Sequence, residues 1–215
     1  MSFPYDRPVP MFPLGSVLLP GMVLPLHVFE ERYRQLVAAV LEQPEPVFGV
    51  TLIERGSEVG GGDVRAQVGC LAQVVEAAQT PDGRWALVSV GTERVRVTRW
   101  LPDDPYPQAE LEAFPEGPAD RDLLADTLGP VESAVRRVAA LAEQLGAPPF
   151  PDDPLADDPV QRGYQLAVLS PVGALDRQRL LVSPGPLLRA ALLAELLAEQ
   201  EELLGAQLDG GGPVD

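Results

Sequence analysis

The sequence contains no lysine and no asparagine, and it has a single histidine and a single cysteine. All 16 basic residues are therefore arginine, and 32 acidic residues outnumber them, which gives a net charge of −16. A P-loop, a Schiff base and a Ser–Lys dyad all require lysine, so this sequence can build none of them. One Cys and one His allow no zinc site made of these residues and no internal disulfide, which fits a reducing cytoplasm.

The composition favours a folded protein that does not bind nucleic acid. The chain has 215 residues, enough for one or two domains, and 46% of them are hydrophobic. Binding to a phosphate backbone depends on clustered Lys and Arg. The acidic net charge therefore disfavours DNA and RNA as partners.

The stretch from Met11 to Phe29 contains no charged residue, and its length is close to the roughly 20 residues that span a bilayer. Residues that break a helix interrupt it at Pro13, Gly15, Pro20, Gly21 and Pro25. A signal peptide needs a positive leader, whereas here Asp6 and Arg7 cancel. We therefore expect no membrane span and no secretion signal, but short buried strands joined by turns.

The next part of the sequence predicts one helix followed by strands. Apolar residues spaced by three and four indicate an amphipathic helix that starts near Val28: Phe29, Tyr33, Leu36, Val37 and Val40. Strand signals follow at 46–53, 68–79, 84–90, 93–100 and 108–114. The turn sequence Thr-Pro-Asp-Gly at 80–83 predicts a hairpin. Short strands at this spacing suggest a closed or half-closed antiparallel barrel.

Two of these segments alternate clearly between apolar and polar residues. In 93–100, Val95 and Val97 are expected inside, with Arg94, Arg96 and Thr98 on the opposite face. In 108–114 the residues expected inside are Ala109, Leu111 and Ala113.

Beyond residue 115 the pattern becomes helical. Apolar residues from Leu124 to Leu145 recur by three and four, with a kink or split expected at Gly129–Pro130. An acidic, Pro-rich linker covers 146–159, and helices are expected around 160–170 and 173–181.

A last helix is expected to begin with Ser183 as its N-cap and Pro184 as its first residue. Its apolar stripe would contain Leu187, Leu188, Ala191, Leu192, Leu196, Leu197 and Leu203. The fold class is thus α+β, with a barrel domain at 1–117, a helical bundle at 118–205 and a disordered tail at 206–215.

Several motifs, in order, resemble one known family. They are "FPLGSVLLPGMVLPLHVFEERYRQLV", "FGVTLI", "VGCLAQV", "DGRWALVSVGTERVRV", "AELE" and "DRQRLL". Together they span residues 9 to 204 and are similar to the N-terminal substrate-binding domain of Lon proteases. The phrases "PLHVFEERY" and "GTERVRV" carry most of the resemblance.

The resemblance implies a PUA-like β-barrel followed by a helical bundle, which agrees with the pattern described above. In Lon this domain helps to recognise unfolded or tagged substrates and supports hexamer assembly. Without lysine the chain could contain neither the ATPase module nor the Ser–Lys protease domain. The resemblance therefore implies a free-standing, non-enzymatic protein that binds unfolded or apolar protein segments, and with them a protease or chaperone, in the cytoplasm.

The residues that could carry chemistry give weak signals. His27 lies at the expected helix start, where a packing role is favoured over catalysis, because no Gly-x-Ser-x-Gly motif surrounds any serine. Cys70 lies within a strand pattern that is typical of a buried, inert thiol. The "GGGD" run at 60–63 fits a hairpin tip better than a phosphate loop. We therefore assign no catalytic, metal-binding or cofactor-binding residue.

Two surfaces are candidates for binding. Leu18, Leu19, Pro20 and Met22, with Gly21, form an apolar loop that could bind protein segments if it is exposed, or belong to the core. Arg94, Arg96 and Trp100, with Arg99, would form a basic-aromatic patch for RNA, the alternative function of a PUA-like protein. The same arginines could instead form cross-strand pairs with Glu93, Glu110 and Glu112.

Overall fold

The computed structural model describes residues 7–56 and 63–210 of the chain. The chain divides into two compact units, Met1–Pro115 and Glu116–Asp215. The expected "GGGD" tip at 60–63 lies outside the described residues except for Asp63. Within the described ranges, none of the helices combines the length and apolar character that crossing a membrane requires.

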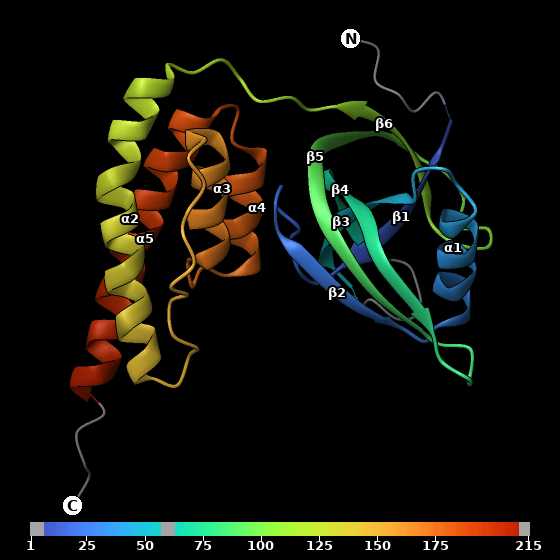
Figure 1. The fold of residues 1–215 in the computed structure, drawn as a ribbon, viewed down its shortest axis with the longest axis horizontal. Helices are drawn as coiled ribbons and strands as arrows, with labels where there is room; N and C mark the ends of the chain where they lie inside the picture. Colours follow the sequence, from blue (N-terminus) through green and yellow to red (C-terminus); the bar gives the residue numbers. More distant parts are fainter. Residues whose placement is uncertain (1–6, 57–62, 211–215) are drawn as a thin grey trace, which may run out of the picture. The chain divides into compact units, whose positions relative to one another are not determined.

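The described residues of the first unit form six strands and one helix (Figure 1). The strands are β1 (Val9–Leu14), β2 (Val23–Val28), β3 (Val47–Arg55), β4 (Val64–Gln79), β5 (Trp85–Trp100) and β6 (Gln108–Ala113). Helix α1 (Glu31–Leu41) lies between β2 and β3 in the sequence. It begins later than expected, because the residues up to Val28 pair with β5 as a strand.

The strands form one mixed sheet whose hydrogen bonding closes into a ring. The order is β2-β5-β4-β3-β1-β6, and β6 also pairs with β5, so the ring contains every strand except β2. The expectation of a purely antiparallel barrel is wrong for one pair, because β1 and β3 are parallel. The connection between them includes β2 and α1, which is long enough for the crossover that parallel strands need.

The expected strands 84–90 and 93–100 are one continuous strand, β5. Its first half pairs with β2 and its second half with β6, while β4 runs along the other side. Gly91 lies where the sequence suggested a break. A side chain there would collide with the Leu19 carbonyl oxygen, 2.2 Å from the ideal Cβ position, so Gly91 serves close packing and does not end the strand.

The core of this unit is formed by inward-facing residues of the sheet and of α1. Val95 and Val97 are buried as expected, and so is Ala109, but Leu111 is only half-buried and Ala113 is exposed. The Phe12 and Tyr33 rings stack with their centroids 4.1 Å apart, which joins α1 to β1. The pKa of Tyr33 rises to about 12, mainly because burial disfavours the phenolate.

The second unit consists of four helices: α2 (Arg121–Gln144), α3 (Pro159–Leu169), α4 (Ala174–Val182) and α5 (Pro186–Gly210). The side chains of Asp120 and Asp158 each accept two backbone N–H bonds and cap α2 and α3. Helix α2 contains Pro130 and continues through it, so it is not split. Helices α2 and α5 pack side by side along much of their length (Figure 1).

Helix α5 departs from expectation at both ends. It begins at Pro186, and the Ser183 hydroxyl donates a hydrogen bond back to the Arg179 carbonyl at the end of α4, where an N-cap was expected. The residues of α5 that lie in the core are Ala190, Leu193, Leu196 and Leu197, whereas Leu188 and Leu203 are exposed. Residues 206–210 are helical and not a disordered tail, and 211–215 lie outside the described residues.

A buried arginine lies at the centre of the second unit, and nothing in the sequence pattern marked it. Arg189 is 1% exposed, and its Nη2 atom donates to both carboxylate oxygens of Glu116 at 2.6 and 2.7 Å. Its guanidinium also lies 3.8 Å from the centre of the Tyr164 ring, and the Tyr164 hydroxyl donates to Glu116. These contacts join Glu116 to α3 and α5.

Candidate functional site

The expected apolar loop at 18–22 is mostly core. Leu18 and Leu19 are 2% and 0% exposed, so the interpretation of these two residues as an exposed binding surface is wrong. The loop folds back onto β5, where the Gly21 N–H donates to the Gly91 carbonyl at 2.8 Å and the Gly91 N–H donates to the Met22 carbonyl at 2.9 Å. Pro20 and Met22 are half-buried, and only Gly21 of the five is exposed.

The arginine face does not form a free positive patch. Arg94 is 4% exposed, so the expectation that it lies on the exposed face is wrong. Its guanidinium lies 4.5 Å from the centre of the Phe114 ring, and its Nη2 atom donates a hydrogen bond to the Pro115 carbonyl. The Arg65 guanidinium lies 4.6 Å from the centre of the half-buried Trp100 ring.

Carboxylates pair with the two exposed arginines of this face. Arg96 bonds Glu112 at 3.2 Å, and the Arg99 Nε atom bonds Glu110 at 3.0 Å, in the cross-strand positions that the sequence suggested. The hydrogen bond from Arg99 holds the pKa of Glu110 below its usual value. The charges of this face are therefore balanced locally.

A different surface, on strand β2, presents apolar groups to solvent. Val23, Pro25 and His27 are exposed on one face of the strand, and Phe29 follows directly after it. Val23 is 56% and Phe29 63% exposed. The register places Val90, Val88 and Ala86 of β5 opposite Val23, Pro25 and His27. We call the residues Val23, Pro25, His27, Phe29, Ala86 and Val88 the β2 surface.

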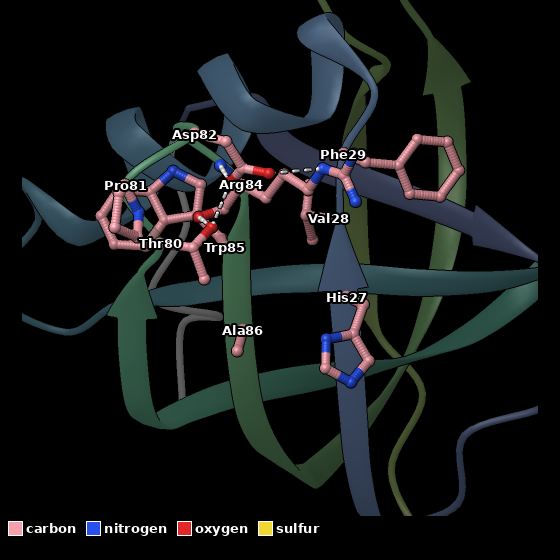
Figure 2. A pocket seen from close by; sticks show the side chains of 9 residues that line it. All are labelled: His27, Val28, Phe29, Thr80, Pro81, Asp82, Arg84, Trp85 and Ala86. Atoms are coloured by element: carbon pink, nitrogen blue, oxygen red, sulfur yellow. Dashed lines mark hydrogen bonds and ion pairs between the residues drawn. The ribbon is translucent and has the colours of Figure 1, made fainter.

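The β2 surface is hollowed on both sides of His27. One hollow of about 500 Å³ extends from His27 and Phe29 to the turn between β4 and β5 (Figure 2). A second, of about 480 Å³, extends from Pro25 across β5 to Ala78 of β4. A smaller hollow, of about 100 Å³, has Phe12 and Tyr33 in its wall. In Figure 2 the Phe29 ring points away from the turn, and the residue is 63% exposed.

The turn that borders the hollow of about 500 Å³ is the hairpin that the sequence predicted at 80–83. The Gly83 N–H donates to the Thr80 carbonyl at 2.8 Å, and Gly83 has a φ of +82°, which favours glycine. A hydrogen bond from the Thr80 hydroxyl, followed by one from the Arg84 N–H, holds the pKa of Asp82 below its usual value. Arg34 of α1 fixes the turn in place, because its Nε atom donates to the Gly83 carbonyl at 2.7 Å.

Neither His27 nor Cys70 lies beside a catalytic partner among the described residues of this unit. In the described part of the chain, the imidazole of His27 makes no hydrogen bond or ion pair. Cys70 is fully buried, and burial raises its pKa to about 12, so the thiol stays protonated at neutral pH. Among residues 7–56 and 63–210, no three His, Cys, Asp or Glu side chains gather in a way that could hold a metal ion. The β2 surface is suited to binding apolar groups.

Comparison with known proteins assigns the family. Residues 8–199 match the family described as the ATP-dependent protease La (LON) substrate-binding domain, and the chain belongs to this family. It is 27% identical over 211 residues to the Lon protease of Desulfovibrio desulfuricans, covering 93% of this chain and 23% of that protein. It is 25% identical over 195 residues to Lon protease 2 of Desulfotalea psychrophila, covering 90% of this chain and 25% of that protein. The chain thus spans about a quarter of the length of these relatives.

Two solved structures share the fold. A Lon N-terminal domain protein from Xanthomonas campestris is 29% identical, with a TM-score of 0.62 over 89% of this chain and 98% of that one. The N-terminal domain of the Mycobacterium avium complex Lon protease gives a TM-score of 0.63 over 90% of this chain and 99% of that one, at 17% identity. The resemblance on which the sequence interpretation rested is therefore confirmed.

Proposed function

We propose that this protein is a non-enzymatic recognition module whose β2 surface binds exposed apolar segments of unfolded proteins. The observation that carries the proposal is the exposed aromatic ring of Phe29 beside hollows in the first unit of a substrate-binding domain. Exposed apolar patches of this kind mark binding sites for partners. The proposed surface replaces the 18–22 loop, because Leu18 and Leu19 are core.

The expected affinity for one segment is low. Burying one large apolar side chain contributes about 1.5–3 kcal/mol before the entropy of association is subtracted, and Phe29 is the only aromatic residue of the β2 surface. A single segment should therefore bind with a Kd around micromolar or weaker. An unfolded protein with several such segments gains apparent affinity through multivalency.

Binding to a reduced, carboxymethylated protein labelled with a fluorophore tests this proposal. Phe29→Ser should weaken binding roughly 10- to 100-fold, since it removes about 1.5–3 kcal/mol of apolar contact, and should leave the melting temperature unchanged. Leu175→Ser is the matched control, because Leu175 is exposed to a similar degree (67%) but lies on α4. Equal affinity of both variants for the unfolded protein would contradict the proposal.

The other parts of this proposal follow from the same residues. We expect no ATP hydrolysis and no peptidase activity, because the chain has no lysine and His27 has no partner in the described residues. A protease or chaperone that receives the bound segment would act in the cytoplasm, where the thiol of Cys70 stays reduced. RNA binding is disfavoured because Arg96 and Arg99 already pair with glutamates.

A further inference from the structure

Strand β2 is the terminal strand of the sheet. It pairs with β5 on one side, and no described strand pairs with its other side. The backbone groups on that side are therefore available to a further strand.

The hydrogen-bond pattern identifies which backbone groups these are. The Gly91 N–H donates to the Met22 carbonyl, and the β2–β5 register makes Met22 and Gly91 opposite residues of a hydrogen-bonded pair. Hydrogen-bonded and non-hydrogen-bonded pairs alternate in an antiparallel ladder. The N–H groups of Val23 and His27 and the C=O groups of Val23, Pro25 and His27 therefore point away from β5.

The free edge thus has a defined set of donors and acceptors. It offers the N–H groups of Val23 and His27 and the C=O groups of Val23, Pro25 and His27. Pro25, which has no N–H, lies at a position where no bond to β5 is lost, as is typical of proline in an edge strand. None of these three residues forms any other hydrogen bond in the described part of the chain.

An apolar hollow lies on this same edge. The hollow of about 100 Å³ is lined by Phe12 and Leu14 of β1 and by Leu26, His27 and Val28 of β2, two strands that do not pair with each other. Its wall also includes Phe29, Glu30 and Tyr33. An added strand would direct alternate side chains to the buried side of β2, where Leu24 and Val28 lie, and the others to its exposed side, where Val23 and Pro25 lie.

We infer that the free edge of β2 binds an extended segment of the partner protein by strand addition, with apolar side chains at alternate positions. The inference rests on the proposed function and specifies its partner: a neutral or basic segment. A chain of net charge −16 repels acidic segments.

The test compares His27→Pro with His27→Ala. Both remove the imidazole, but only His27→Pro also removes the N–H that faces the partner, and Leu26 already has the extended backbone that a residue before proline needs. The probe is a synthetic nine-residue peptide that alternates leucine and threonine between terminal arginines, measured by calorimetry. His27→Pro should bind it roughly five- to tenfold more weakly than His27→Ala.

A second measurement leaves the protein unchanged and remains valid if His27→Pro fails to fold. Methylating the peptide amides one at a time should weaken binding only at every second position, because an added strand directs alternate N–H groups to β2. Equal affinity of the two His27 variants together with no alternation would overturn strand addition. If wild-type protein binds neither this peptide nor a carboxymethylated protein, the proposed function itself fails.

Discussion

Truncation of Leu19 tests the packing that moves the candidate surface away from the 18–22 loop. Leu19 is fully buried, so Leu19→Ala should destabilise the first unit by about 2–5 kcal/mol through lost apolar contact and an unfilled cavity. For a unit of this size, about 4 °C is lost per kcal/mol, which predicts a melting temperature lower by roughly 8–20 °C. Differential scanning calorimetry measures this change directly.

Two further variants make the Leu19 prediction specific. Val23→Ala, at an exposed position four residues later, should change the free energy of unfolding by less than about 0.5 kcal/mol. Gly91→Ala should destabilise the protein as Leu19→Ala does, because its methyl group would collide with the Leu19 carbonyl. A melting temperature of Leu19→Ala within 2 °C of wild type corresponds to a loss of only about 0.5 kcal/mol. Such a result, together with lost binding of unfolded protein, would mean that the loop is exposed and would refute the burial of Leu19.

Two other predictions concern the buried polar groups. Glu116→Gln should lower the free energy of unfolding, measured by urea denaturation, by about 3–5 kcal/mol, because it leaves the charge of Arg189 buried without a carboxylate. Glu112→Gln removes an exposed ion pair and should change the free energy of unfolding by less than about 1 kcal/mol. Equal effects of the two variants would contradict the burial of Arg189. Burial raises the pKa of Cys70 from 9.0 to about 12. As the pH rises, the thiol therefore loses its proton in the unfolded state before it does so in the folded state, and the free energy of unfolding should fall between pH 9 and pH 12. Urea titrations from pH 8 to 11 should show a smaller fall for Cys70→Ala than for wild type, and an unchanged fall would count against a buried thiol.

The local elements of the first unit could be predicted because short-range rules determine them. The turn at 80–83 has Pro, Asp and Gly where the turn geometry requires them, and the alternation around Val95 and Val97 follows from one buried face. The sequence pattern predicts a break between 84–90 and 93–100, where Gly91 lies, because glycine is typical both of turns and of close approach between backbones. Only the tertiary contact with Leu19 distinguishes the two.

The candidate surface was missed because both faces of β2 are apolar. Leu24 and Val28 are buried while Val23 and Pro25 are exposed, so hydrophobicity does not separate inside from outside. The proline within the strand was the one signal of an edge. The sequence also contained no sign that Arg94 and Arg189 are buried, because a charged residue is expected at the surface. Only the tertiary structure shows that Arg94 lies on Phe114 and that Arg189 lies beside Glu116 and Tyr164.

An amide chemical-shift titration of ¹⁵N-labelled protein with unlabelled carboxymethylated protein locates the binding surface. The shifts should concentrate at residues 23–29 and 80–88, while the amides of α4 and of residues 108–113 should not respond. Shifts confined to the helical unit, or to β6 and the arginines opposite it, would contradict binding at the β2 surface.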